Sequence, residues 1–531
     1  MEYFGDHFWS TLSTFLLTVV LLWVAYIAVA AAEMFIITPM KIKRIMNRQG
    51  VQGPSGHLLL GNRMDAYRLQ QVEAEKDLKT GDYNILSHVM PFHVWNCQSY
   101  GKSYLWQFGS EVWIAIAKPD PYKQALTKKN LFKRSETKKR TLKLVTGANG
   151  LLTTSEEEWA LHRQIVHHAF HQENLKTMIG AMEKSALSMA DNLEKKVKDG
   201  GGCLELDISD YMANVTSDIL SHTLFGSSYE QGKKVLDGIA SLMLNRSKQP
   251  FAMIPGHRLL PLPINIKRIM TQISISRSIR EIIQLRKDMV KATNNTSYGN
   301  DLLGVLLTAT SEKTTTKGGK VHFGMQQVID NCKTFFLTGS DSSKTFLTWT
   351  MMLLASHTTW QERAREEVRE VCGHGDYPLN FEMFNKLKTL TMILYETLRL
   401  FPPFPTQVKQ ATMDIMIGDL HIPKGACTFF SRLAIHHDPK LWGTDVHEFK
   451  PERFVDGIVN ASKHESAFQP FSFGKKSCLG QGFALQQAKV VLVTMLQRFR
   501  FHLSPNYRHA PYIKLTLIPK YGVPLILECL D

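Results

Sequence analysis

The chain has 531 residues, of which 44% are hydrophobic and 21% charged, so an intrinsically disordered protein is excluded. Its 63 basic and 48 acidic residues give a net charge of +15, which favours an anionic partner such as a membrane surface or an acidic protein. We expect no nucleic-acid partner, because the chain has neither a basic tail nor zinc-finger spacing. Seven cysteines without a CxxC pair argue against a disulfide framework or a thiolate zinc site and fit a reducing compartment.

The N-terminal region contains an uncharged segment, Phe8–Ala32, that is long enough to cross a bilayer as a helix, which needs about 20 apolar residues. A cleavable signal peptide is the alternative, because Ala28–Ala30 resembles its small-residue cleavage site. The apolar segment is too long for such a peptide, and the residues before it, Glu2 and Asp6, are acidic rather than basic. We therefore predict a membrane anchor over residues 1–38.

Basic residues follow this segment directly, whereas no lysine or arginine precedes it: Lys41, Lys43, Arg44 and Arg48. The positive-inside rule therefore places the rest of the chain in the cytosol. The run GVQGPSG closes the basic segment, so residues 39–56 are predicted to form a basic, Gly- and Pro-containing linker. Residues 57–531 show no internal repeat and no loop rich enough in Gly, Ser or Pro to divide them, which indicates one domain.

Long amphipathic helical patterns dominate this domain, and short strand-like runs are few. The clearest helices are expected at Asn174–Lys198, Arg268–Thr293, Met325–Ser356, Thr359–Cys372 and Gln481–Phe499. Strands are expected at YLWQFG, at VWIAIA, around MIGDLHIP, and near the end at IKLTLIP and VPLILECL. The pattern predicts a mainly α domain with a small β-sheet region.

The stretch FSFGKKSCLG, residues 471–480, holds Cys478 between two glycines. A thiolate that binds an iron porphyrin needs amide N–H groups or a helix N-terminus near its sulfur, because both lower a thiol pKa. Gly474 and Gly480 allow close backbone approach, a helical pattern starts after Cys478, and Phe471 can shield the sulfur. The alternative is a buried structural cysteine in a strand-to-helix turn.

Two further motifs are informative because of the order in which they occur along the chain. Glu396 and Arg399 lie three residues apart on one predicted helix face and can pair. The spacing alone is not specific, but FPP follows it, and FKPERF then supplies a second guanidinium in Arg453. A carboxylate between two arginines is a plausible buried brace near a cofactor.

The second motif is FFLTGSDSSKTFLTW, in which Gly339 and small polar residues interrupt an otherwise apolar helix. Such residues locally weaken the helix and can open a groove for a ligand or water. The alternative is a polar patch on a surface helix, which the apolar residues on both sides disfavour.

In this order, from anchor to terminal strands, the motifs resemble the cytochrome P450 family of haem-thiolate monooxygenases, and the resemblance covers the whole chain. It implies haem b as cofactor, with Cys478 as the axial thiolate ligand of the iron and Phe471 and Gly480 beside it. It implies that Glu396, Arg399 and Arg453 form the structural brace. The residues expected to approach the haem propionates are Trp159 and Arg163 of EWALHR, and Asp341 with Ser342 is expected to deliver protons during oxygen activation.

Three positions depart from the family pattern. Lys476, two residues before the cysteine, and Lys409, after the proline-rich loop, stand where arginines are usual. A lysine can still pair with a propionate, although it loses the bidentate fork. Ser342 replaces a threonine and lacks the methyl group that fixes the rotamer, so proton delivery is expected to survive with more uncoupling.

Within the family, runs such as SYGNDLLGVLL and LAIHHDPKLWG resemble the plant clan that hydroxylates hormones and terpenoids, above all cytokinin hydroxylases and brassinosteroid-inactivating hydroxylases. The resemblance implies a single-pass enzyme of the endoplasmic reticulum that uses O2 and electrons from an NADPH-dependent reductase. It implies hydroxylation of an apolar, isoprenoid-derived small molecule. The alternatives are a family member that rearranges a peroxide without a reductase, and a catalytically silent haem-binding membrane protein.

Overall fold

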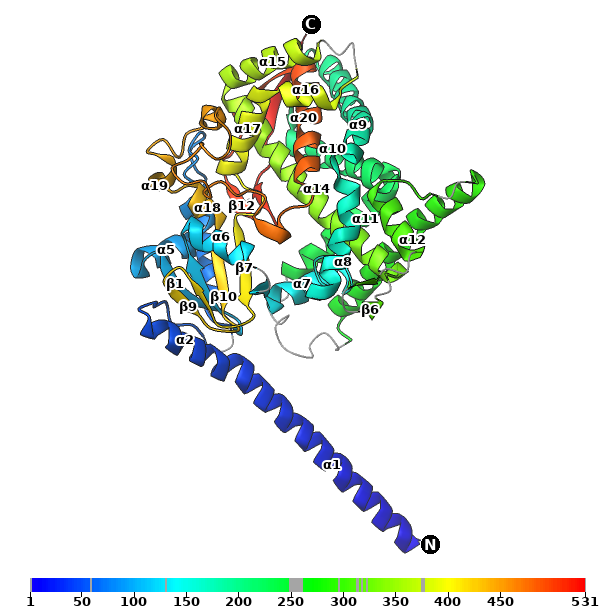
Figure 1. Cartoon of the computed structure of the whole chain (residues 1–531), viewed down its shortest axis with the longest axis vertical. Helices are drawn as coiled ribbons and strands as arrows, with labels where there is room; N and C mark the ends of the chain where they lie inside the picture. The colour runs from blue at the N-terminus through cyan, green and yellow to red at the C-terminus, as the bar shows by residue number, and fades with distance from the viewer. Residues whose placement is uncertain are drawn as a thin grey trace.

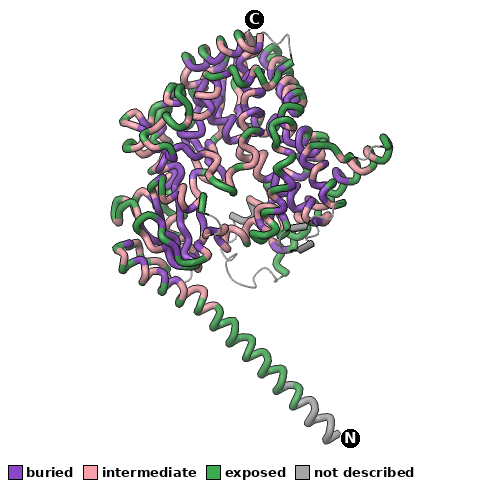
Figure 2. Tube along the Cα trace, viewed as in Figure 1, coloured by how far each residue is buried: buried purple, intermediate pink, exposed green. Residues whose placement is uncertain are grey.

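The first helix of the chain projects away from a mainly helical domain in the computed structural model (Figure 1). The structure describes residues 2–57, 60–128, 131–247, 261–294, 297–311, 315–316, 319–320, 323–373 and 378–530. The first elements are α1 (Glu2–Ala32), the π-helix η1 (Glu33–Ile37) and α2 (Thr38–Arg48). Where its burial is described, α1 is almost entirely exposed (Figure 2), and the Thr14–Arg48 stretch is apolar enough to cross a membrane. The predicted single N-terminal apolar helix is therefore present.

Residues 39–56, expected to form a linker, lie against the domain. Ile42 and Met46 of α2 and the following Val51 belong to the hydrophobic core. The amide of Leu105 donates to the carbonyl of Gln52 over 3.0 Å. A Cβ at Gly53 would lie 1.6 Å from the Leu105 carbonyl oxygen, so this glycine permits close packing of two backbones. These contacts fix the end of the N-terminal helical segment to the sheet.

The largest sheet has the strand order β1–β2–β10–β7–β3 and lies near α2 (Figure 1). Its strands are β1 (Ser103–Phe108), β2 (Glu111–Ile116), β10 (Cys427–Ser431), β7 (Thr406–Ala411) and β3 (Phe132–Arg134). Only the β2–β10 pairing is parallel. Both of these central strands are buried along their whole length, as expected for strands with apolar residues on both faces.

The other strands form smaller sheets. A three-stranded sheet has the order β11–β14–β4, and β12 pairs with β13 in a hairpin. The strands are β4 (Cys203–Asp207), β5 (Thr315–Thr316), β6 (Gly319–Lys320), β8 (Ile415–Ile417), β9 (Leu420–Ile422), β11 (Phe499–Leu503), β12 (Pro511–Ile513), β13 (Leu517–Pro519) and β14 (Pro524–Cys529). Every strand-like run expected from the sequence contains at least one of these strands or of β1 and β2.

The long helices follow the predicted patterns, and α14 (Met325–Ser356) has the predicted bounds. The others are α9 (Gln172–Asp199), α10 (Ile208–Phe225), α12 (Pro263–Ala292), α15 (Thr358–Cys372), α17 (Lys388–Leu400) and α20 (Gln481–Arg498). Only α12 begins well before the expected residue, Arg268. Pro263 lies in its first turn, where an N–H group has no acceptor within the helix, so proline is tolerated there.

Short helices complete the domain. They are α3 (Arg63–Ala74), α4 (Leu86–Val89), α5 (Pro91–Tyr100), α6 (Pro119–Thr127), α7 (Glu136–Thr146), α8 (Glu156–His167), η2 (His168–Phe170), α11 (Tyr229–Ser247), α13 (Leu302–Ser311), α16 (Phe381–Lys386), α18 (Arg432–His436), α19 (Pro439–Trp442), η5 (Pro451–Phe454) and η6 (Gly474–Lys476). The described chain is 62% helical.

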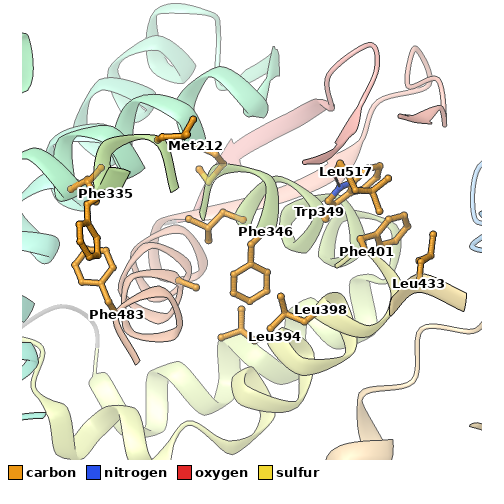
Figure 3. Packing of buried hydrophobic residues seen from close by; sticks show 14 of the residues in the cluster. Met212, Phe335, Phe346, Trp349, Leu394, Leu398, Phe401, Leu433, Phe483 and Leu517 are labelled. Carbon is orange, nitrogen blue, oxygen red and sulfur yellow. Dashed lines mark hydrogen bonds between the residues drawn. The ribbon is translucent and has the colours of Figure 1, made fainter. Parts of the chain in front are cut away.

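The core is built around α14. Phe346 of α14 faces Leu394 and Leu398 of α17 (Figure 3), and Trp349 stacks on Phe401 with ring centroids 4.1 Å apart. Residues 328–337 of α14 are buried, residues 338–342 are partly exposed, and almost every later residue is buried again. The middle of α14 is therefore less covered by other elements than either of its flanks.

Candidate cofactor site

The cysteine loop connects η6 to α20. The amide of Cys478 donates to the carbonyl of Phe471 over 2.9 Å, which closes the loop. Gly474 has a φ of +72°, and a Cβ there would lie 2.6 Å from the carbonyl oxygen of Leu126, so this position requires glycine. Gly480 has an ordinary φ of −88°, and its Cβ would only touch the Phe170 ring at 3.8 Å. The protein's own atoms therefore demand a glycine at the first position and not at the second.

Cys478 is exposed to solvent. Desolvation by the surrounding protein raises the pKa of the Cys478 thiol, whereas the amide N–H of Gly480 and the charges of Arg163 and Arg432 act in the opposite sense and favour the thiolate. The following helix, α20, turns its positive N-terminus toward the same loop. The sulfur is thus accessible, and its hydrogen-bonding and charged neighbours favour the anionic form that a metal ligand needs, while desolvation opposes it.

The described residues contain no group of three or more His, Cys, Asp or Glu side chains that could hold a metal ion. A metal bound at Cys478 would therefore need most of its ligands from elsewhere. An iron porphyrin meets this requirement, because the macrocycle supplies the equatorial ligands and the protein needs to supply only an axial one.

A group of cations, called here the cation cluster, consists of Arg134, Lys409 and Lys476. Arg134 on β3 lies opposite Lys409 on β7 in the sheet register. Burial, followed by the charges of Arg134 and Lys476, lowers the pKa of Lys409 to about 7. In the part of the chain that the structure describes, no carboxylate forms an ion pair with Lys409 or Arg134. With Lys409 buried and Arg134 and Lys476 partly buried, this excess of positive charge fits an anionic group such as a haem propionate.

Lys476 and Trp159 are both expected to approach the haem propionates, and the structure places the two side chains in contact. The Lys476 amino group lies 5.2 Å from the centre of the Trp159 ring and also forms an ion pair with Glu156. Ser155 caps α8 in a capping box, and Trp159 and Arg163, four residues apart, therefore share a face of α8.

Arg163 reaches the cysteine loop itself. One of its guanidinium nitrogens, Nη1, donates to the carbonyl of Ser477 over 3.0 Å. Burial lowers the pKa of Arg163, and a negative charge on Cys478 would oppose this effect. Arg163 therefore connects α8 to the residue before the thiol, while its contact with a propionate stays a prediction.

The polar segment of α14 does not end the helix, which is continuous from Met325 to Ser356. A Cβ at Gly339 would lie 2.7 Å from Leu220, so the glycine allows α10 to pack closely on α14. The hydroxyl of Ser342 donates to the carbonyl of Thr338 over 2.7 Å. Asp341 and Ser342 are both partly exposed, and no hydrogen bond or ion pair described by the structure joins them to the cysteine loop.

The brace residues Glu396, Arg399 and Arg453 lie together in the interior. Arg399 donates through Nε and Nη2 to the two carboxylate oxygens of Glu396, at 2.7 Å each, and both side chains are fully buried. Arg453 Nε lies 3.4 Å from Glu396 Oε1. Burial opposes ionisation of Asp445, but hydrogen bonds from Arg453 and Lys450 lower its pKa to about 2. Each buried charge in the brace therefore has a partner of opposite sign.

The sequence reasoning missed three residues of this region. Arg134 lay in a basic stretch, whose usual explanation is a solvated surface. Arg432 begins α18, donates to the carbonyl of Gln469 over 2.7 Å and favours the thiolate of Cys478. Thr516 contacts Asp341. Nothing near any of them in the sequence signals these contacts, which form between distant segments.

Comparison with known proteins places these features in a family. A profile of the family described as Cytochrome P450 matches residues 84–523. A cytokinin hydroxylase of Arabidopsis thaliana is 38% identical over 501 residues, which cover 94% of this chain and 94% of that protein. An echinocystic acid 23-monooxygenase of Saponaria officinalis is 35% identical over 500 residues, which cover 92% of this chain and 94% of that protein.

A solved structure shows the same fold. A retinoic acid-bound cyanobacterial CYP120A1 has a TM-score of 0.68 and 20% identity, with 90% of this chain and 99% of that chain covered. This likeness confirms the predicted fold, mainly α with a small β-sheet region.

Proposed function

Because the chain belongs to the cytochrome P450 family and is a haem-binding monooxygenase, we propose that it hydroxylates an apolar, isoprenoid-derived small molecule of the cytokinin, steroid or terpenoid type. The observation that carries this proposal is the similarity, over nearly the full length, to proteins named cytokinin hydroxylase and to the echinocystic acid 23-monooxygenase. O2 is the second substrate, and an NADPH-dependent reductase supplies the electrons.

The cofactor would be held from two sides. Cys478 provides the axial thiolate, with Phe471 and Gly480 beside the sulfur. The cation cluster, Trp159 and Arg163 hold the propionates, since the cluster carries positive charge without enough carboxylates of its own. When bound, the haem supplies the activation of oxygen, which electron donation from a thiolate favours.

Asp341 and Ser342 are the residues that move protons in this proposal. The Ser342 hydroxyl is held by the Thr338 carbonyl, so its proton is directed along the helix. The Asp341 carboxylate is held by a neighbouring hydroxyl while the side chain stays partly exposed. A positioned acid beside a hydroxyl can exchange protons with water and pass them inward.

The substrate would lie beside the middle of α14. Residues 338–342 are partly exposed between buried flanks, and Phe404 of the loop before β7 is 40% exposed. The region around Arg246–Pro263 is a further candidate for the substrate pocket and lies mostly outside the described residues. Apolar and small polar surfaces of this kind suit a mostly hydrocarbon molecule with few hydrogen-bonding groups.

The proposed location is the endoplasmic reticulum membrane, with the catalytic domain in the cytosol. One apolar N-terminal helix and the basic residues that follow it support a single-pass anchor of this orientation. The net charge of +15 suits both anionic lipid and an acidic docking face on a reductase.

The first experiment is the carbon monoxide difference spectrum of reduced microsomes that contain the full chain. We expect the Soret band of a thiolate-ligated haem in the wild type and its loss in Cys478→Ser. Absence of this band in the wild type would contradict the proposal. NADPH-driven turnover of cytokinins, brassinosteroids, gibberellins and terpenoids with a reductase then tests the substrate class, and turnover independent of NADPH would indicate peroxide rearrangement instead.

A further inference from the structure

A buried threonine outside the family motifs holds the acid of the proton-delivery pair. Thr516 lies in the turn between β12 and β13 and is fully buried. Its hydroxyl donates to Asp341 Oδ2 over 2.7 Å, and its oxygen lies 2.9 Å from the hydroxyl oxygen of Thr345. Asp341 and Thr345 are one helical turn apart on α14, so the turn of the hairpin bridges them.

The direction of these hydrogen bonds follows from counting protons. A hydroxyl has a single proton, and Thr516 donates it to the carboxylate. Thr345 must therefore donate to Thr516. The result is a chain of two hydroxyl groups that ends on Asp341, and charge-assisted bonds of this kind are about twice as strong as neutral ones.

The turn that carries Thr516 is itself firmly held. Trp349 Nε1 donates to the carbonyl of Leu517 over 2.6 Å, and the amide of Leu517 donates to the carbonyl of Pro403 over 3.0 Å. Figure 3 shows Leu517 beside Trp349 and Phe401. Thr516 thus has a fixed position relative to α14, and a fixed donor can set the rotamer of the carboxylate that it binds.

We propose that Thr516 is a positioning residue that orients Asp341 for proton delivery. The proposal rests on the proposed function. It also addresses the serine at position 342, whose hydroxyl lacks the methyl group that restricts a threonine rotamer. The Ser342 hydroxyl is held by one hydrogen bond, to the Thr338 carbonyl, and the bond from Thr516 gives Asp341 the fixed orientation that proton transfer requires.

Thr516→Val tests this, because valine keeps the branched shape and removes the hydroxyl. The full chain would be assayed in membranes with an NADPH-dependent reductase, first without added substrate. If proton delivery becomes rate-limiting, NADPH oxidation slows by about tenfold and its solvent deuterium isotope effect rises. Thr516→Ser should restore both values, since it returns the donor.

Thr348→Val is the matched control. Thr348 is a buried threonine of α14, and among the described residues its hydroxyl bonds only to the carbonyl of Lys344. It should leave the oxidation rate and the isotope effect close to those of the wild type. Equal behaviour of the two valine variants would overturn the proposal.

A second measurement does not depend on turnover. Thermal unfolding midpoints of Thr516→Val, Asp341→Ala and the double variant form a cycle, followed by circular dichroism. Thr516→Val should lower the midpoint by about 2 °C, and the double variant should fall by less than the sum of the two single effects, because both changes remove the bond between Thr516 and Asp341. Additive shifts would contradict a direct interaction.

The two proposals fail in different ways. If the wild type lacks the thiolate-haem spectrum, the proposed function is wrong. If the wild type shows the spectrum and oxidises NADPH while Thr516→Val matches it in rate and isotope effect, only the role of Thr516 is wrong.

Discussion

The brace and the cation cluster are both groups of charges inside the domain, and they differ in how those charges are balanced. In the brace, Glu396 accepts from Arg399 and lies close to Arg453, and backbone carbonyls take the remaining donors of Arg399. In the cation cluster, Lys409 is only 9% exposed and has Arg134 and Lys476 as close neighbours, and Glu156 is the one carboxylate that acts on it among the described residues. The brace is thus balanced within the protein, whereas the cluster keeps an excess of positive charge. This contrast is what the proposed binding of an anionic group by the cluster predicts.

Breaking the brace should have the largest effect. Glu396→Gln or Arg399→Met leaves a buried charge without its partner, which costs about 3 to 5 kcal/mol. The yield of folded protein, measured by the carbon monoxide difference spectrum per milligram, should collapse. Glu173→Gln is the control, because Glu173 and Lys176 form an ion pair at the same spacing but are 80% and 40% exposed, so the loss should be under about 1 kcal/mol.

Substitution in the cation cluster should weaken haem binding without destabilising the haem-free protein, in contrast to the brace. Lys409→Met should weaken haem retention by about tenfold, the loss of one charge-assisted bond to a propionate, while Lys409→Arg retains it. The haem-free protein should keep or gain stability, because a buried cation without a partner has been removed. Haem content against total protein and thermal unfolding of the haem-free form measure the two effects. Equal destabilisation with and without haem would show that Lys409 belongs to a structural network.

Asp445, at the edge of the brace, should give the smallest effect, which appears as a pH-dependent change in stability. The pKa of Asp445 is lowered to about 2 from an ordinary value of about 4. The stabilisation of the folded protein by the ionised Asp445 carboxylate is therefore complete above about pH 4 and is lost as the pH falls toward about 2. Asp445→Asn should lower the unfolding midpoint at about pH 6, equivalent to about 1 kcal/mol for a partly solvated pair, and leave it unchanged near pH 2. An equal difference at both values would assign the effect to packing.

The sequence was informative where a signal is local. The bounds of α14 agree with prediction because a long apolar pattern interrupted by a few polar residues indicates a buried helix. The start of α12 was predicted too late, since Pro263 opens the helix ahead of its clear periodicity. For Gly339, the sequence suggested a weakened helix, whereas the structure gives close packing against Leu220 as the reason for glycine.

The family, the N-terminal apolar helix and the cysteine loop could be predicted from the sequence alone, because each depends on residues that are neighbours in the chain. Phe471, Gly474 and Cys478 act over a few residues, and the loop closes through a bond between Cys478 and Phe471. Only the tertiary structure decided which charges and hydroxyls meet. Arg134 lies beside Lys409 through the pairing of β3 with β7, and Thr516 reaches Asp341 because a hairpin from the end of the chain packs on α14. Such contacts depend on the register and packing of distant elements, which no local pattern specifies.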